Sequence, residues 1–479
     1  MAKSFATTTV SLFLLSSGLV PVLAHRGNVR LRRGEYPSGE AYTWLPLDQI
    51  HSTPDSYVSN TLPVSSSYDA GAQPTLASAP PLPQATLDIA AYPELDVIPP
   101  TDSPEVKQWV DAIDWDLIPK IDPTQPGDCA PGKDAYNLRG ADGNCWWTCG
   151  QCTRDVDIST CANFMDYGHT YDDGPARYTT KLLTYLEAKG QHATFFLIGS
   201  RIRERPEVVR YEYMTGHELG VHTWSHARGL TTMTNEEIVA ELGWTRKIIY
   251  DVIGVTPKLM RPPQGDIDDR VRAISLAMGM IPVLWTGLTD EQTGLEITWD
   301  SNDWRVHDGG NATEIQHTWE GVLDSTTQFT DHGIVALQHD KAPETVDLAI
   351  GYTLPFVENH NPPFSIKPVM QCQNRPYGDI FEETNTNKDN PAFGTDDVAT
   401  RRSNLGYAAS HGQATSVSLT VSRTYASGPT GTGTRTTQQT SSTGGGGDGG
   451  APNAALHSSS GSSFGILSAV LLVTYMFSM

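Results

Sequence analysis

ATFFLIG, at residues 193–199, is an apolar run of strand length that ends in a glycine. Its aromatic residues and short length are typical of a buried strand. Four later segments have the same form: HELGVHTW (217–224), KLMRPP (258–263), IPVLWTG (281–287) and GIVALQH (333–339). We therefore expect all five to be strands of one buried sheet system.

Helical segments lie between these runs. Residues 177–190, 234–254 and 268–279 carry apolar residues with the period of a helix, and Thr234 is positioned to cap the second of them. Strands and helices that alternate in this way predict an α/β fold with a parallel sheet, and the number of units predicts a (β/α) barrel over residues 155–375. Catalytic side chains of such barrels lie at the carboxyl ends of the strands.

The two ends of the chain differ from this body. Residues 1–24 contain Lys3, then an apolar run, then small residues up to Ala24, which predicts a secretory signal peptide. Residues 453–479 have small residues, a polar spacer and an apolar tail, the order expected of a glycosylphosphatidylinositol (GPI) anchor signal with attachment at Asn453. We therefore expect a secreted protein in the cell wall and on the outer face of the cell membrane.

Two polar segments flank the body. Residues 25–126 are rich in Pro, Ser, Thr and Ala without a sustained period, which predicts a disordered, low-complexity arm. Residues 376–452 are dominated by Ser, Thr and Gly, which is typical of an extended, O-glycosylated stalk. Asn311 begins an Asn-Ala-Thr sequon for N-glycosylation, so we expect it in a surface loop.

The chain is acidic. Its 33 Lys and Arg residues stand against 55 Asp and Glu residues, so the formal net charge is -22 at pH 7. A surface of this charge repels phosphate backbones and favours cationic or neutral partners. Nucleic acid is therefore not an expected partner.

The chain has six cysteines: Cys129, Cys145, Cys149, Cys152, Cys161 and Cys372. The spacing of Cys149 and Cys152 alone suits zinc, but a secreted chain passes through an oxidising compartment, which favours three disulfides. Cys161 is expected to pair with Cys372 and to tie the start of the body to its end. The other four cysteines would pair within the Cys-rich segment, residues 127–154, in a pattern that the sequence leaves open.

Acidic and imidazole side chains stand where strands are expected to end. Asp172 and Asp173 are adjacent, and successive residues of a strand point to opposite faces, so the two carboxylates are expected to do different work. His222 and His226 are four residues apart, so one turn brings both rings to one side. Two histidines and one aspartate make an open three-ligand site that suits zinc and leaves a position for water.

The surroundings of this aspartate pair carry further expectations. Gly174 would let the chain turn sharply, and Pro175 suits the first position of the following helix. His169 is expected to be a buried neutral histidine.

The later strand ends add more polar groups: Arg261 in RPPQG, then Asp300, Asp303 and Trp304 in DSNDW, then Leu337, His339 and Asp340 in ALQHD. Taken alone, Arg261 could form a surface ion pair and His339 could be a core histidine. Together with the three-ligand site they supply a spare carboxylate, a spare histidine and partners to orient both. Metal-assisted hydrolysis needs that set of groups.

These motifs, in this order, resemble those of the polysaccharide deacetylases, a carbohydrate esterase group with a NodB-like, distorted (β/α) barrel, and among them the fungal chitin deacetylases. The resemblance covers residues 155–375. It implies hydrolysis of the N-acetyl groups of chitin or partly deacetylated chitosan during remodelling of a fungal cell wall. The cofactor would be Zn²⁺, Co²⁺ or another divalent transition metal, and we expect a monomer.

The family pattern also implies roles for individual residues. Asp173, His222 and His226 would bind the metal. Asp172 would be the general base that deprotonates water, and Arg261 would hold that base ionised and in place.

The remaining positions concern the leaving group and the pocket. His339 would be the general acid that protonates the leaving amine, and Asp303 would orient and charge it. Trp304 and Leu337 would shape the pocket for the acetyl methyl. A backbone N–H near Gln264 would bind the oxyanion; the family usually has a tyrosine at this position, so the wall of the sugar site is expected to differ.

Three alternatives stay open. Two histidines and a carboxylate also bind non-haem iron in oxygenases, but that reading leaves Asp172, Arg261 and His339 without roles. A barrel with weak or no turnover could serve as a chitin-binding wall protein. A deacetylase with this site could also act on another N-acetylated wall polysaccharide.

Overall fold

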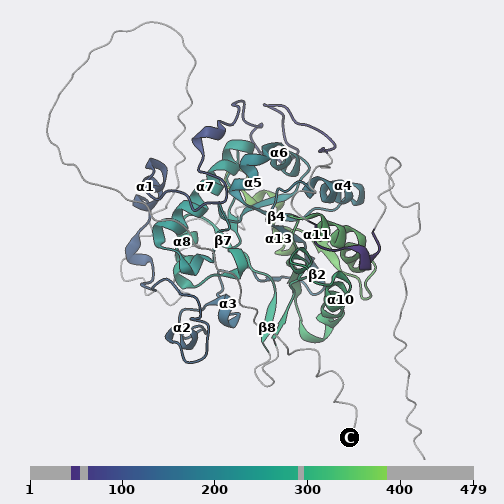
Figure 1. Ribbon diagram of the computed structural model, residues 1–479. Helices are drawn as coiled ribbons and strands as arrows, with labels where there is room; N and C mark the ends of the chain where they lie inside the picture. Colours follow the sequence, from purple (N-terminus) through teal and green to yellow (C-terminus); the bar gives the residue numbers. More distant parts are fainter. Residues whose placement is uncertain (1–44, 54–62, 290–295, 386–479) are drawn as a thin grey trace, which may run out of the picture. The chain divides into compact units, whose positions relative to one another are not determined.

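The computed structural model describes residues 45–53, 63–289 and 296–385 (Figure 1). They all belong to the first of two compact units, residues 1–421. The predicted signal peptide, most of the predicted stalk and the predicted anchor residue Asn453 lie outside the described residues.

A five-stranded sheet forms the centre of the fold. Its strands, in spatial order, are β3 (Thr170–Asp172), β4 (Thr194–Leu197), β5 (Glu218–Val221), β6 (Leu259–Met260) and β7 (Ile281–Pro282). Every neighbouring pair in this sheet is parallel. The strands lie side by side in the order in which they occur in the chain, because each crossover connection places the next strand on the same side of the preceding one.

A second sheet completes the barrel. Its order is β1 (Thr160–Cys161), β10 (Gly333–Val335), β2 (Asp166–Gly168) and β11 (Ser365–Lys367), with only β1 antiparallel. Two isolated parallel bridges join this sheet to both edges of the first, Asp172 to His339 and Ile158 to Val283. The predicted α/β barrel is therefore confirmed, and its closure by single bridges makes it distorted.

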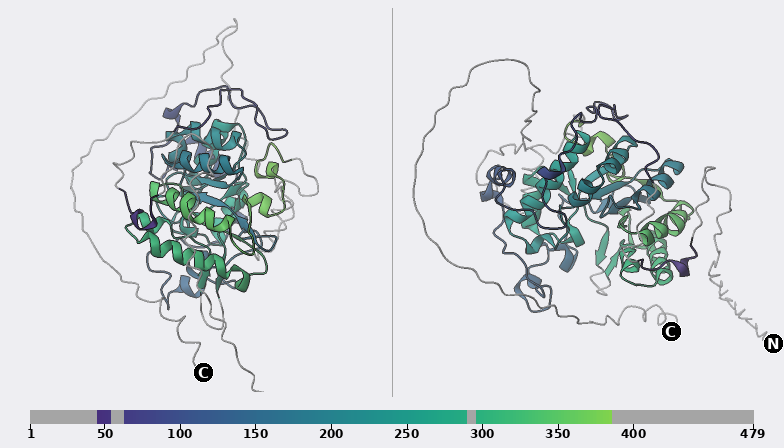
Figure 2. Two further views of the ribbon diagram at one scale, coloured as in Figure 1. Left: turned by 90° about the vertical axis from the view of Figure 1, so that its right-hand side faces the viewer. Right: turned by 45° about the horizontal axis from the view of Figure 1, so that its top comes forward.

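Helices surround the strands (Figures 1 and 2). Their bounds are α1 Pro104–Asp111, α2 Asp134–Asn137, α3 Trp147–Gly150, α4 Thr179–Lys189, α5 Gly199–Glu204, α6 Pro206–Met214, α7 Asn235–Ile253, α8 Asp269–Ala277, α9 Trp304–His307, α10 Ala312–Phe329, α11 Pro343–Leu348, α12 Leu354–Glu358 and α13 Val369–Cys372. The three helices expected from the sequence are α4, α7 and α8. Thr234 caps α7 in a capping box with Glu237, as its position predicts.

Shorter elements link these helices and strands. They are η1 Leu47–Gln49, η3 Ile89–Ala91, η4 Trp115–Leu117, η5 Leu230–Thr232, η6 Pro263–Gly265, the π-helical turn η7 Ala349–Thr353, η8 Tyr377–Ile380, and the antiparallel hairpin of β8 (Gly287–Thr289) with β9 (Glu296–Thr298).

The prediction of a disordered arm is wrong for residues 63–126. Val106 and Trp109 of α1 are buried in the main core, and the Trp109 ring meets Trp244 of α7 edge to face with centroids 5.6 Å apart. A Cβ at Gly243 of α7 would clash with the Trp109 ring, so this glycine makes room for the contact. Composition missed the segment because widely spaced single apolar residues anchor it without any period.

The predicted boundary between body and stalk is also wrong. Ile380 and Phe381 are fully buried, and Phe381 forms an antiparallel bridge with Pro257 next to β6. Residues 376–385 therefore belong to the packed body rather than to the stalk. These few apolar residues close the core in a segment whose composition is otherwise polar.

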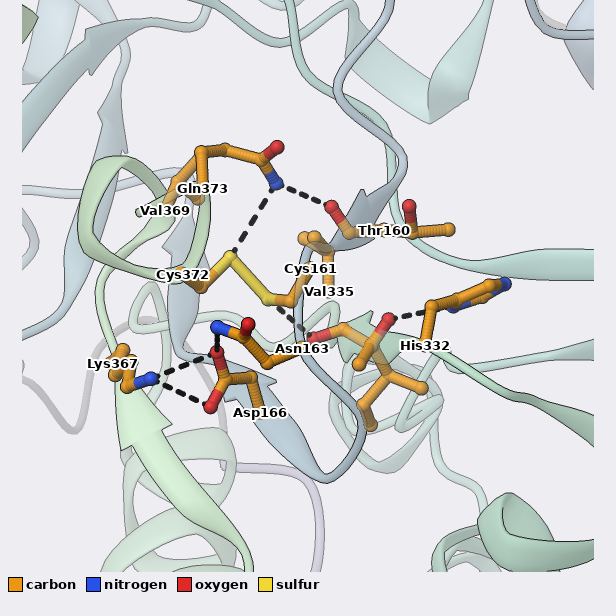
Figure 3. Close-up of a disulfide and its surroundings, with 12 residues drawn as sticks. Thr160, Cys161, Asn163, Asp166, His332, Val335, Lys367, Val369, Cys372 and Gln373 are labelled. Carbon is orange, nitrogen blue, oxygen red and sulfur yellow. Dashed lines mark hydrogen bonds and ion pairs between the residues drawn. A yellow bond between two sulfur atoms is a disulfide. The ribbon is translucent and has the colours of Figure 1, made fainter. Parts of the chain in front are cut away.

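Three disulfides are present. Cys161 is bonded to Cys372, as expected, and joins β1 to α13 across 211 residues (Figure 3). The pattern that the sequence left open is Cys129 with Cys149 and Cys145 with Cys152. Close to the Cys161–Cys372 disulfide, the Lys367 ammonium binds both carboxylate oxygens of Asp166 at 2.7 and 2.8 Å, so an ion pair also joins β11 to β2.

Within residues 45–53, 63–289 and 296–385, no helix is both long enough and apolar enough to span a membrane.

Candidate functional site

Three side chains predicted to bind a metal converge at the carboxyl ends of β3 and β5. One ligand atom from each of Asp173, His222 and His226 lies within 4.8 Å of the other two. Asp173 Oδ1 is 3.3 Å from His222 Nε2 and 3.5 Å from His226 Nε2. Asp173 and His226 have positive φ values of 77° and 52°, a left-handed backbone that is strained for residues with a side chain and that aims both groups inward.

The protonation of these groups suits a cation. His222 Nδ1 donates to the Arg261 carbonyl at 2.8 Å, so the lone pair of His222 lies on Nε2, which faces Asp173. Burial lowers the pKa of His226, which keeps this ring neutral. Asp173 Oδ1 is buried and has no hydrogen-bond partner among the described residues. A buried acceptor without a donor, beside two imidazole lone pairs, fits a divalent cation.

Asp172 differs from its neighbour in its contacts. Its Oδ1 accepts a hydrogen bond of 2.8 Å from Arg261 Nη1, and the Arg261 side chain is fully buried. Its Oδ2 is 3.8 Å from His222 Nε2, so this carboxylate lies beside the ligand group. The two adjacent carboxylates therefore have different contacts, and the expectation that they do different work stays a prediction.

The turn after this pair differs from expectation. The left-handed residue is Asp173, whereas Gly174 is needed because a Cβ there would lie 2.7 Å from Asp340 Oδ1. Pro175 does not begin a helix, since α4 starts only at Thr179, and the Gly174–Pro175 peptide bond is cis. A cis proline continues the turn, which the sequence alone did not reveal.

His339 forms the second charged pair of the site. Its Nδ1 donates to Asp303 Oδ1 at 2.7 Å, and its backbone N–H donates to Asp303 Oδ2 at 2.8 Å. Burial by itself would lower the pKa of His339, but the Asp303 carboxylate, followed by Asp173 and Asp172, raises it to about 9. This imidazole is therefore charged at neutral pH.

Two further residues of the site have no role in the sequence prediction. Lys341 Nζ lies 3.0 Å from Asp173 Oδ2. Asp340 is fully buried and accepts a hydrogen bond from Thr179; burial and the nearby Asp173 raise its pKa to about 7. Asp340 and Lys341 directly follow His339 in the sequence. The signal that could have identified Lys341 is a cationic residue two positions after a histidine at the end of a strand.

The predicted pocket residues lie at this end of the barrel. Leu337 is buried and accepts a backbone hydrogen bond from Ser301 at 3.0 Å. Trp304 is half-buried and begins α9 directly after Asp303. Gln264 is exposed and left-handed, with φ 60°, within η6.

Two other predicted residues lie away from these contacts. His169 is fully buried, and burial lowers its pKa to about 3, so it is neutral as expected. Asn311 is exposed, as predicted, but it caps α10: its Oδ1 accepts hydrogen bonds from the N–H groups of Thr313 and Glu314.

Comparisons with known proteins identify the family of this chain. A family model described as polysaccharide deacetylase matches residues 166–283. Chitin deacetylase 1 of Cryptococcus neoformans var. grubii is 46% identical over 331 residues, which cover 69% of this chain and 68% of the relative. The chitin deacetylase of Amylomyces rouxii is 31% identical over 295 residues, covering 59% of this chain and 66% of the relative.

Solved structures include similar proteins. The chitin deacetylase from the fungal pathogen Colletotrichum lindemuthianum is 20% identical, with a TM-score of 0.41, and the match covers 48% of this chain and 97% of that one.

The protein is an amide hydrolase of a metal-dependent class, as its barrel fold, the three candidate metal ligands and the family match indicate. The chain belongs to the polysaccharide deacetylase family, and its relatives include fungal chitin deacetylases.

Proposed function

We propose that this protein hydrolyses the N-acetyl groups of chitin or partly deacetylated chitosan, releasing acetate and leaving a free amine on the polymer. The observation that carries the proposal is that two charged pairs, Asp172 with Arg261 and Asp303 with His339, stand beside the three candidate ligands. One pair supplies a base and the other an acid, as amide hydrolysis requires. The similarity to chitin deacetylases supports this choice of polymer.

Zinc is the cation that we propose for Asp173, His222 and His226, and cobalt or another divalent transition metal is the alternative. Two imidazoles and one carboxylate are ligands that zinc accepts in open catalytic sites. When bound, such a cation polarises the amide carbonyl and lowers the pKa of a bound water to about 7.

In the proposed reaction, Asp172 takes a proton from the attacking water, whose oxygen bonds to the carbonyl carbon. Arg261 holds Asp172 in place by a hydrogen bond of 2.8 Å, and a backbone N–H near Gln264 donates to the oxyanion. His339, charged by Asp303, then gives its proton to the amide nitrogen, and the C–N bond breaks. The direct products are acetic acid and the amine; acetic acid then loses its proton to give acetate, and the proton on Asp172 returns to His339 through solvent, so atoms and charges balance.

The acetyl group itself needs a place. We propose that Trp304 and Leu337 enclose its methyl, because Trp304 directly follows Asp303 and Leu337 lies two residues before His339. An apolar wall here would favour acetate over larger acyl groups.

The setting of this reaction is also a proposal. Residues 1–24 would direct secretion, and residues 453–479 would be exchanged for a GPI anchor at Asn453. An N-glycan on Asn311 is compatible with its cap, since the glycan attaches to Nδ2 while Oδ1 caps the helix. A secreted monomer at the cell wall would reach chitin there.

The test is acetate release from N-acetylglucosamine oligomers by the purified protein, before and after chelation and after zinc is added back. We expect release that the chelator stops and zinc restores. Absence of release from every oligomer, with zinc bound, would contradict the proposal and favour a chitin-binding wall protein.

The variant Asp172→Asn examines the base. General acid–base catalysis contributes about 100-fold to 10,000-fold, so kcat should fall by at least about 100-fold. Zinc content should stay at one per chain, because Asp172 is not one of the three candidate ligands. Asp142→Asn removes an exposed carboxylate of the Cys-rich segment and is the matched control.

A further inference from the structure

A pocket of about 210 Å³ lies between the Cys-rich segment and the barrel. Its wall includes Trp147, Thr148, Gln151, Trp285, Thr298 and Asp300. Residues 147–151 come from α3 and its C-terminal cap, and the others follow β7 or lie near β9. None of these side chains has a part in the proposed reaction.

The Cys-rich side of the pocket is held firmly. Cys149 and Cys152, on either side of Gln151, are bonded to Cys129 and Cys145. The Trp147 N–H donates to the Ile267 carbonyl at 3.0 Å, which fixes α3 to the barrel. The pocket wall is therefore preformed, as binding sites for small polar ligands usually are.

The floor of the pocket is aromatic. The indoles of Trp147 and Trp285 meet edge to face, with centroids 4.4 Å apart, and Trp285 Nε1 donates to Thr298 Oγ1 at 2.9 Å. A Cβ at Gly265 would lie 2.9 Å from Trp285 Cη2 and would clash with Trp147. Gly265, which directly follows Gln264, therefore packs against both rings.

Two polar residues, Asp300 and Gln151, line the pocket. The carboxylate of Asp300 is the charged group among its lining residues, and Oδ1 accepts from the Asn302 N–H at 2.7 Å. Burial raises the pKa of Asp300 to about 6, so the group is ionised at neutral pH. The amide oxygen of Gln151 is buried and has no hydrogen-bond partner among the described residues. The Asp300 carboxylate can accept hydrogen bonds from a ligand.

The pocket is next to the catalytic groups. Asp300 forms a parallel backbone bridge with Leu337, two residues before His339, and the charge of His339 acts on Asp300. A polymer whose acetylated sugar lies at His339 would therefore extend a neighbouring sugar toward the indoles.

We propose that this pocket binds the sugar next to the one being deacetylated, and that Asp300 selects a glucosamine with a free amine at that position. The inference rests on the proposed function and names its preferred substrate, partly deacetylated chitosan. An ammonium group forms a charge-assisted hydrogen bond with a carboxylate and is attracted to indole rings, whereas an acetamide has neither advantage. The free amine is the product of the same reaction on an adjacent sugar, so one turnover would favour the next.

The kinetic test compares two tetramers, one fully acetylated and one with a single glucosamine beside an acetylated sugar. Wild type should have the higher kcat/KM on the amine-containing tetramer. Losing a charge-assisted hydrogen bond costs about tenfold, so Asp300→Asn should lower kcat/KM about tenfold more on that tetramer than on the acetylated one. The charge control Asp142→Asn should keep the wild-type ratio. An equal loss on both tetramers would mean that Asp300 acts through His339 and would overturn the inference.

The binding test does not depend on turnover. A fully deacetylated glucosamine tetramer has no acetyl group, and calorimetry should show that Asp300→Asn binds it about tenfold more weakly than wild type. Gln151→Asn is the second variant, since asparagine tolerates the left-handed φ of 51° while its shorter side chain withdraws the amide, and it should also bind more weakly. Unchanged binding by both variants would refute the site. If wild type released no acetate from any oligomer, the proposed function would fail while this comparison still decided the pocket.

Discussion

Asp303→Asn should strongly lower the rate of deacetylation at high pH and leave most of it at low pH. In the wild type, both oxygens of Asp303 accept hydrogen bonds from His339, one from Nδ1 and one from the backbone N–H. An asparagine keeps the shape of the side chain but removes its negative charge. The imidazolium then loses the nearest group that stabilises it.

The size of the effect follows from the pKa of His339, which is raised from 6.5 to about 9. A histidine with a raised pKa is charged below that value and loses its proton as the pH rises through it. At pH 8 about nine-tenths of the wild type has a charged His339. If Asp303 supplies the whole rise, the variant has only about 3% charged at pH 8, a loss of about 30-fold, but about three-quarters at pH 6.

The assay is kcat/KM for acetate release between pH 5.5 and 9.5, with zinc content checked at each end. The alkaline limb of the variant should lie below that of the wild type, and the two curves should approach each other near pH 6. Asp308→Asn is the control, since this exposed carboxylate ends the same helix, α9, and should leave the limb in place. A loss of equal size at all pH values would refute the reasoning, because Asp303 would then act on geometry alone.

Two further predictions concern metal affinity and packing. Lys341→Met removes the ammonium that lies 3.0 Å from Asp173 Oδ2, so zinc should bind about twofold to fivefold more tightly, as measured by competition with a chelator. Lys341→Arg keeps the charge and should leave the zinc affinity unchanged. Weaker zinc binding by the methionine variant would count against this account. Gly243→Ala forces a methyl group against the Trp109 ring and should lower the free energy of unfolding by about 1–3 kcal/mol. Gly321→Ala in α10 is the control: its Cβ would meet nothing within 4 Å, so the free energy of unfolding should rise by about 0.5–1 kcal/mol. Thermal unfolding of both variants measures this, and equal effects would contradict the packing argument.

The sequence predicts those parts of the fold that depend on local pattern. The run at 193–199 becomes β4, and Thr234 caps α7, because a strand of apolar residues and a capping box are each complete within a few residues. The strand ends are equally local, since each polar group follows its own apolar run. The candidate metal ligands could therefore be identified from the sequence without knowledge of any contact between distant segments.

What the sequence does not predict depends on contacts between distant segments. Trp109 stabilises residues 63–126 only because Gly243, far along the chain, leaves room for its ring. Lys341 reaches Asp173 only after the barrel has closed. Pro175 is cis in a turn that ends before α4, and nothing in the residues next to it specifies this. Single contacts of this kind have no period and therefore leave no pattern to read.

The same closure explains why two adjacent aspartates can share one site. Asp172 pairs with His339 through a single parallel bridge, and Thr170 hydrogen-bonds the Ala336 carbonyl on the same two segments. A slip of one residue would turn every side chain of β3 to the opposite face, so Asp173 would meet Arg261 and Asp172 would leave the guanidinium that holds it. The register of β3 against the segment after β10 therefore assigns the carboxylates to their different partners. The proposed base and the proposed acid are brought together by the strand pairing that completes the barrel, so we infer that folding and assembly of the site are one event.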